Sequence, residues 1–69
     1  MQNVPAAMFI SDDESIRVVV IRKNGDNYVQ WNDEPEIKIT EDYVATLNIT
    51  QVTYIGNLIK YIDDLLEGN

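Results

Sequence analysis

A chain of 69 residues forms one domain at most, and a domain this short buries only about 60% of the surface of its unfolded chain. It contains no cysteine and no histidine, which excludes disulfides, thiolate metal sites, and the commonest metal ligand and general base. The net charge of −7 disfavours a nucleic-acid or anionic-membrane partner, because both partners require basic patches.

The first part of the chain reads as a loose start followed by two strands. Residues 1–5 form the loose start, which ends at Pro5. Residues 6–10 are a short apolar run that suits an edge strand, and residues 11–15 are polar and predict a turn. Residues 16–23 are dense in β-branched side chains and give the strongest strand prediction of the chain.

Asn24-Gly25 is the leading sequence signal for a two-residue hairpin turn of type I′, in which both residues adopt positive φ. Such a turn fixes the register of the hairpin, and the expected cross-strand partners are Lys23 with Asp26, Ile21 with Tyr28, Val20 with Val29, and Val18 with Trp31. A three-residue loop is the alternative, and it would pair Ile21 with Val29. The choice matters because a slip of one residue moves every side chain to the other face of the sheet.

The segment after the hairpin contains a turn and then an alternating strand. We expect the turn at residues 32–35. Residues 36–40 alternate apolar and polar side chains, which is typical of a half-buried strand. Residues 43–48 also alternate, and their β-branched content favours a further strand. A helix that starts at Thr40 is the competing interpretation.

The hydrophobic period changes at Asn48, after which apolar residues recur every three or four positions, as in an amphipathic helix over residues 49–67. Asn48 and Gln51 have the spacing of a capping box, and Gly68 stands where a glycine commonly follows a helix. Gly56 in the helix interior costs roughly 1 kcal/mol relative to alanine. Its small size suggests close approach of a strand or a second helix.

These elements define one small α+β domain over residues 1–69. We expect a three- to four-stranded antiparallel meander within residues 6–47, with the C-terminal amphipathic helix of residues 49–67 packed on one face.

The hairpin of residues 16–31 carries apolar side chains on both of its faces, although one helix covers only one face of a sheet. Val18, Val20, Val29 and Trp31 form the face that we expect under the helix, and Val19, Ile21 and Tyr28 form the other. Exposed apolar area of this kind usually marks an interface. The alternatives are that residues 6–10 fold over it, or that Arg17, Arg22 and Lys23 lay their aliphatic stems across it. Tyr54 and Tyr61 share one face of the helix and are further candidate interface anchors, so the candidate interface residues are Val19, Ile21, Tyr28, Tyr54 and Tyr61.

The acidic residues come in clumps whose spacing does not match a calcium-binding loop. Asp63, Asp64 and Glu67 lie near the C-terminus of the helix, where they face the negative end of the helix dipole, and they form a candidate acidic patch for a basic partner. No phosphate-binding loop and no convergent acid–base pair are present. We therefore expect no catalytic, metal or cofactor site.

The function that this pattern favours is a non-catalytic interaction or assembly protein that self-associates through the second apolar face of the hairpin. Self-association is also a usual means of stabilising so small a domain. The alternative is an acidic inhibitor or DNA mimic that blocks the basic cleft of a nucleic-acid-binding enzyme and is encoded by a phage. We expect a homo-oligomer or a basic protein surface as partner, and neither nucleic acid nor membrane.

The composition also bears on location and origin. The first residues lack the positive region and the long apolar core of a signal peptide, and no apolar run approaches the roughly 18 residues of a membrane span. The absence of cysteine fits a reducing compartment, so we expect a cytoplasmic protein. Frequent Ile and Asn with scarce Leu indicate an AT-rich genome, such as that of a bacterium or its phage.

Overall fold

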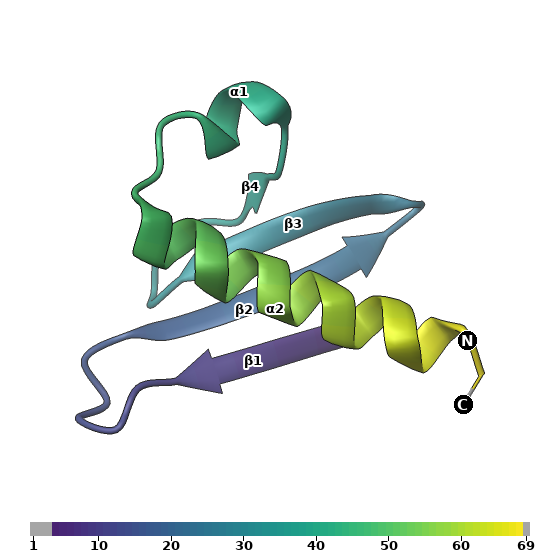
Figure 1. The fold of residues 1–69 in the computed structure, drawn as a ribbon, viewed down its shortest axis with the longest axis horizontal. Helices are drawn as coiled ribbons and strands as arrows, with labels where there is room; N and C mark the ends of the chain where they lie inside the picture. The colour runs from purple at the N-terminus through teal and green to yellow at the C-terminus, as the bar shows by residue number, and fades with distance from the viewer. Residues whose placement is uncertain (1–3, 69) are drawn as a thin grey trace.

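The computed structural model describes residues 4–68, which form a four-stranded antiparallel sheet followed by two helices (Figure 1). The strands run in the order β1-β2-β3-β4, so each pairs with its neighbour in sequence. The elements are β1 (Ala6–Ile10), β2 (Arg17–Lys23), β3 (Asp26–Trp31), β4 (Ile37–Lys38), α1 (Glu41–Val44) and α2 (Ile49–Leu66). The predicted α+β meander with a C-terminal helix is confirmed.

The β2–β3 hairpin has the register that a two-residue turn predicts. Lys23 pairs with Asp26, and the ladder continues to Val18 opposite Trp31. Asn24 and Gly25 have φ values of 55° and 85°, which place both turn residues in the left-handed region that a type I′ turn requires. The alternative with a three-residue loop is therefore wrong, and the faces of the hairpin are those expected from the sequence.

β1 lies beside β2 in the sheet and does not fold over its face. Ala7 pairs with Val20 and Phe9 with Val18. The ladder extends beyond the strand, since the Arg22 backbone N–H donates to the Pro5 carbonyl at 2.9 Å. Of the predicted loose start, residues 1–3 lie outside the described part of the chain.

α2 begins and ends where its capping signals predict. The Asn48 side chain accepts a hydrogen bond from the Gln51 backbone N–H at 2.9 Å, and the Gln51 side chain accepts one from the Asn48 backbone N–H at 3.1 Å. This reciprocal capping box satisfies two donors that a helix N-terminus leaves free. At the other end, Glu67 is the C-cap and Gly68 follows with φ 84°, a conformation that glycine adopts without steric cost.

The strand predicted for residues 43–48 is wrong, and the competing helix is the structure found. The short helix α1 follows Thr40, whose hydroxyl accepts a hydrogen bond from the Tyr43 backbone N–H at 3.1 Å. Glu41 and Asp42 occupy the first turn, where negative charge is favourable. The strand predicted for residues 36–40 is shorter than expected, because only Ile37 and Lys38 pair in β4.

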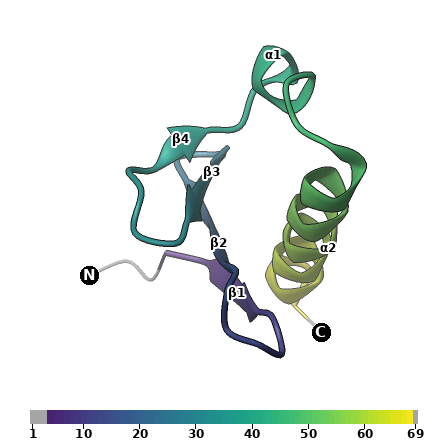
Figure 2. The same cartoon turned by 90° about the vertical axis from the view of Figure 1, so that its left-hand side faces the viewer.

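The hydrophobic core lies between α2 and one face of the sheet (Figure 2). Alternate residues of each strand reach this face, and α2 contributes residues spaced by three and four positions. The buried set comprises Ala7, Val18, Val20, Val29, Ile55, Leu58 and Ile62. Trp31 packs against this core as a partly buried side chain, beneath the helix as predicted.

Gly56 is not a point of close approach, contrary to the sequence expectation. A Cβ atom at this position would meet no other atom within 4 Å, and the residue is exposed in the interior of α2. Glycine at this position therefore makes no packing contribution and lowers the stability of α2 through its conformational entropy.

We expect the change Gly56→Ala to raise the free energy of unfolding by about 1 kcal/mol, because alanine has the higher helix propensity and meets no steric obstacle. Thermal unfolding at a fixed protein concentration measures the gain, which corresponds to about 4–8 °C in a domain of this size. Gly68→Ala is the matched control and is expected to destabilise, because its φ of 84° disfavours any side chain. A lower melting temperature for Gly56→Ala would contradict the open environment assigned to this position.

Candidate interaction surfaces

The face of the sheet that points away from α2 carries a continuous set of apolar side chains, which we call the open face. Side chains alternate between the two faces of a strand, so the neighbours of the buried core residues point away from α2. The open face comprises Ala6, Met8 and Ile10 of β1, Val19 and Ile21 of β2, and Tyr28 of β3. In Figure 2, α2 lies on one side of the sheet only, and no described helix covers the other.

The exposure of these side chains rises toward β1. Val19, Ile21 and Tyr28, which the sequence singled out, are half-buried by their neighbours within the sheet. Met8 and Ile10 are 58% and 46% exposed and extend the apolar surface to the edge of the sheet. The edge strand predicted for residues 6–10 carried no register, so the face on which Met8 and Ile10 lie follows only from the pairing of β1 with β2.

Charged side chains border the open face, and opposite charges are paired. Lys23 Nζ lies 2.8 Å from Glu36 Oε1, and it also lies 4.8 Å from the centre of the Tyr28 ring. The hydrogen bond from the Lys23 ammonium to Glu36 raises the pKa of Lys23. Lys38 Nζ lies 3.6 Å from Asp26 Oδ2, and Arg17 Nη2 lies 2.6 Å from Asp33 Oδ1. These pairs are solvent-exposed and contribute little to stability, but they leave this border without a large net charge.

Arg22 does not lay its stem across the open face. Its guanidinium reaches the other side of the sheet, where Nη1 lies 2.6 Å from Asp63 Oδ1 on α2. The candidate acidic patch is thereby divided, because Asp63 is held in an ion pair while Asp64 and Glu67 are exposed. The sequence could not reveal this pair, since it depends on how α2 is placed across the sheet.

Tyr54 and Tyr61 lie on the α2 side of the molecule and not on the open face. The Tyr54 ring stacks on Phe9 of β1 with 4.9 Å between the ring centres. Tyr61 lies two helical turns further on the same side of α2 and is 57% exposed. The structure therefore separates the five predicted interface residues into two groups on opposite sides of the sheet.

The acidic turn between β1 and β2 is organised around Asp13. Its Oδ1 accepts hydrogen bonds from the backbone N–H and hydroxyl of Ser15 and from the hydroxyl of Ser11, at 2.7–3.0 Å. These donors favour the ionised form and lower the pKa of Asp13 to about 2. Asp13 is thus accounted for as a turn residue, whereas Asp12 and Glu14 point into solvent.

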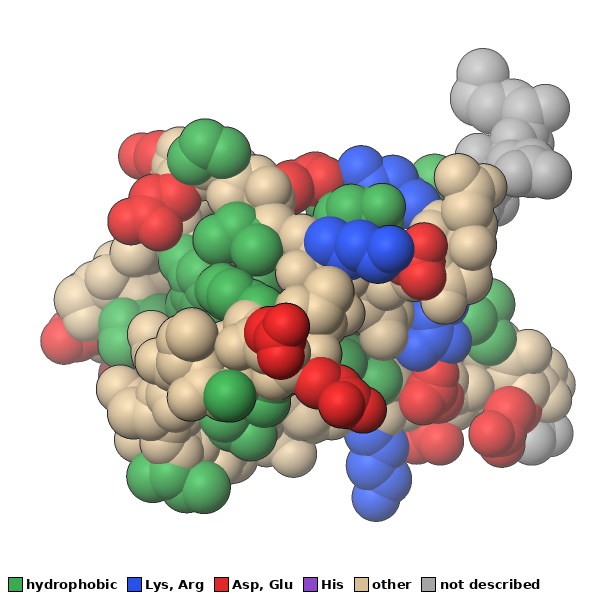
Figure 3. All heavy atoms as spheres, turned by 90° about the horizontal axis from the view of Figure 1, so that it is seen from above, with side chains coloured by type: hydrophobic (Ala, Val, Ile, Leu, Met, Phe, Trp, Pro, Cys, Tyr) green, Lys and Arg blue, Asp and Glu red, His purple; other side chains and the backbone are tan. Residues whose placement is uncertain are grey.

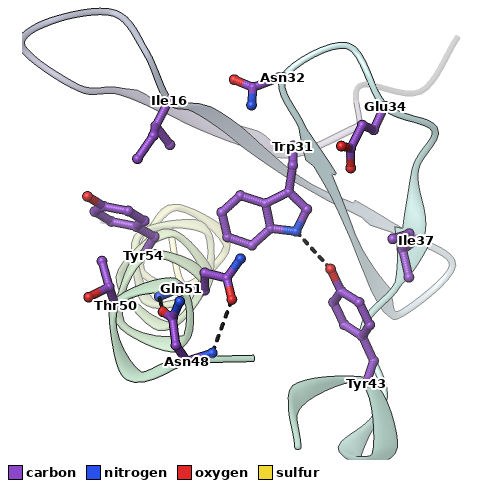
Figure 4. Close-up of a pocket in the computed structure, with 10 residues that line it drawn as sticks. All are labelled: Ile16, Trp31, Asn32, Glu34, Ile37, Tyr43, Asn48, Thr50, Gln51 and Tyr54. Atoms are coloured by element: carbon purple, nitrogen blue, oxygen red, sulfur yellow. Dashed lines mark hydrogen bonds between the residues drawn. The ribbon is translucent and has the colours of Figure 1, made fainter. Parts of the chain in front are cut away.

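A pocket of about 430 Å³ opens between α1, the start of α2 and the end of β3, and sequence reasoning did not predict it. Seen from the α1 side, apolar side chains gather here beside acidic ones (Figure 3). In Figure 4, Trp31 stands between Tyr54 and Tyr43, and its indole N–H donates to the Tyr43 hydroxyl at 2.7 Å. The pocket exists because residues 41–44 form a short helix, capped by Thr40 and with an acidic first turn, instead of a further strand.

Within residues 4–68, no three acidic side chains gather closely enough to hold a metal ion. Across the same residues, no helix is both long and apolar enough to span a membrane. Comparisons of the chain with models of protein families, with curated proteins and with solved structures gave no match.

Proposed function

We propose that this chain is a non-catalytic assembly protein and that a second copy docks on the open face of its sheet. The observation that carries the proposal is the apolar face itself: Met8, Ile10, Val19, Ile21 and Tyr28 form one surface that no described segment covers. Contiguous apolar surface of this kind marks protein contact sites. A domain of 69 residues also gains needed stability from association.

The charge distribution favours a second copy over a basic partner at this face. The chain carries a net charge of −7, yet the acidic residues that border the open face are matched by Arg17, Lys23 and Lys38. The unpaired carboxylates lie elsewhere, as at Asp12 and Asp64. Two open faces can therefore meet without bringing the acidic groups into the contact. Added salt, which screens the remaining repulsion, is expected to strengthen the assembly.

The change Val19→Asp tests the proposal. A carboxylate at the centre of the open face would be buried without a partner, and such burial costs roughly 3–5 kcal/mol, or more than about 100-fold in affinity. Sedimentation analysis should give a wild-type particle at least twice the monomer mass of 7.9 kDa and a smaller particle for the variant.

Asn57→Asp is the matched control, because it adds the same charge at an exposed position on α2. It is expected to keep the wild-type mass. A wild-type chain that stays monomeric at high concentration and high salt would overturn the proposal. So would a Val19→Asp particle with the same mass as Asn57→Asp.

A second candidate function rests on the exposed acidic groups. Asp64 and Glu67 at the end of α2, with Asp12 and Glu14 in the β1–β2 turn, present carboxylates that no described side chain neutralises. An acidic inhibitor or DNA mimic would use such groups against the basic cleft of a nucleic-acid enzyme. This alternative predicts a monomer that binds a basic protein at low salt and releases it at high salt, which is the opposite salt response.

A further inference from the structure

The outer edge of β1 offers backbone groups that no residue of the described range 4–68 pairs, at three alternate positions. In an antiparallel ladder, alternate residues of a strand bond to the neighbour, and the residues between them point their N–H and C=O outward. Arg22 N–H donates to Pro5 O, and Ser11 N–H donates to Ile16 O. These two bonds show that the odd-numbered residues of β1 are the ones whose backbone groups bond to β2. The N–H and C=O groups of Ala6, Met8 and Ile10 therefore point away from the sheet.

The two edges of the sheet differ in how they resist strand addition. The edge at β4 is only two residues long, follows Pro35, and contains the charged Lys38. Short strands, proline and charge are the usual protections of a sheet edge. β1 has five residues, Ala-Ala-Met-Phe-Ile, without charge or proline. It is the unprotected edge of the described sheet and is suited to pairing with another strand.

We propose that β1 pairs in antiparallel fashion with β1 of a second copy, around a two-fold axis at Met8. This register places Ala6 opposite Ile10 and Ala7 opposite Phe9 of the other copy, so that Phe9 and Ile10 each meet an alanine and Met8 meets Met8 of the other copy. It also joins all the outward backbone groups of both strands and forms one continuous sheet. The contact goes beyond the proposed function, because it uses the edge of the sheet and leaves the open face available.

The side chains that flank the edge on the α2 side support this arrangement. Phe9 is 38% exposed and carries the Tyr54 ring, with Tyr61 and Leu65 further along the same side of α2. An edge-paired second copy would bring its own α2 alongside these groups. The tyrosines of α2 and the apolar residues of the open face, which are separated in the monomer, would then lie on either side of one joined sheet.

Charge selects the antiparallel orientation. Asp12 begins the acidic part of the turn four residues after Met8, so antiparallel pairing places the two Asp12 residues about 27 Å apart along the strands. This separation exceeds the screening length of about 8 Å at physiological ionic strength. Parallel pairing would set the two acidic turns side by side at roughly 5 Å. A second copy therefore fits this edge in one direction only.

The change Met8→Pro tests the edge contact. Proline removes the outward N–H and fills its place with the ring, but no hydrogen bond among residues 4–68 is lost, and edge strands tolerate such a residue. Met8→Ala is the matched control, because it removes the same side chain and keeps the N–H. We expect the dissociation constant of the edge contact to rise at least roughly 30-fold for Met8→Pro over Met8→Ala, as measured by sedimentation.

Amide hydrogen exchange of the wild-type chain keeps the test decisive if Met8→Pro fails to fold. Paired edges should slow exchange at the amides of Ala6, Met8 and Ile10 as protein concentration rises, whereas an unpaired edge leaves these amides fast at every concentration. Fast exchange in an associated particle, or equal masses for the Met8 variants, would overturn the edge contact and leave the open-face proposal standing. A smaller particle for Met8→Pro, together with an unchanged particle for Val19→Asp, would overturn the open-face proposal and leave the edge contact standing.

Discussion

The change Ile62→Ala is expected to lower the free energy of unfolding by about 2–5 kcal/mol. Ile62 has no exposed surface and lies in the core cluster with the valines of β2 and β3. Truncation removes apolar contacts and leaves a cavity that the single helix cannot fill without moving. A domain of 69 residues has a total stability of roughly 3–10 kcal/mol, so this one change removes a large part of it. Urea-induced unfolding at fixed protein concentration measures the loss.

Ile49→Ala is the matched control, since it removes the same atoms from the first residue of the same helix. Ile49 is 78% exposed, and we expect its truncation to change stability by no more than about 0.5 kcal/mol. Equal losses for the two variants would show that α2 is not seated on the sheet in the orientation described.

The parts of the fold that were predictable from the sequence are those fixed by local chemistry. Asn24-Gly25 determines a turn in which both residues have positive φ. This two-residue turn fixes every cross-strand pair of the β2–β3 ladder. The capping box at Asn48 and the apolar period that follows it determine where α2 begins and which side of it is buried. The separation of Val19 from Val20 onto opposite faces follows from the same register.

Other features depend on contacts between distant residues, and the sequence alone did not reveal them. The alternation of Tyr43, Ala45 and Leu47 fits a strand, but the Thr40 cap and the acidic first turn favour a helix, and the hydrogen bond from Trp31 to Tyr43 ties this helix to the end of β3. The place of Tyr54 and Tyr61 relative to the open face also depended on the packing of α2, which no local pattern specifies.

The candidate surface was therefore predicted in part. The register identified Val19, Ile21 and Tyr28 correctly as residues of the face that α2 leaves uncovered. Met8 and Ile10 join them only because β1 pairs with β2 and turns these side chains toward the same face. Placing them on this face requires the register of β1 against β2. The turn between these two strands contains no sequence signal as strong as Asn24-Gly25, so the sequence did not fix that register.

We expect the change Trp31→Ala to reduce the free energy of unfolding by about 2–3 kcal/mol and to release α1 from the sheet. A buried tryptophan costs about 3–5 kcal/mol on truncation, and Trp31 is half-buried. It packs against the core and is the hydrogen-bond donor to Tyr43 of α1. Urea unfolding measures the loss of stability, and faster amide exchange over residues 41–47 reports the release of α1.

Tyr43→Phe separates the two roles of Trp31, because it removes the hydroxyl that accepts the indole N–H and keeps the ring in place. Loss of one hydrogen bond of this kind costs about 0.5–1.5 kcal/mol. We therefore expect Tyr43→Phe to speed amide exchange over α1 while most of the global stability remains. If Trp31→Ala were no more destabilising than Tyr43→Phe, the indole would serve only as a tether for α1, and its assignment to the edge of the core would be wrong.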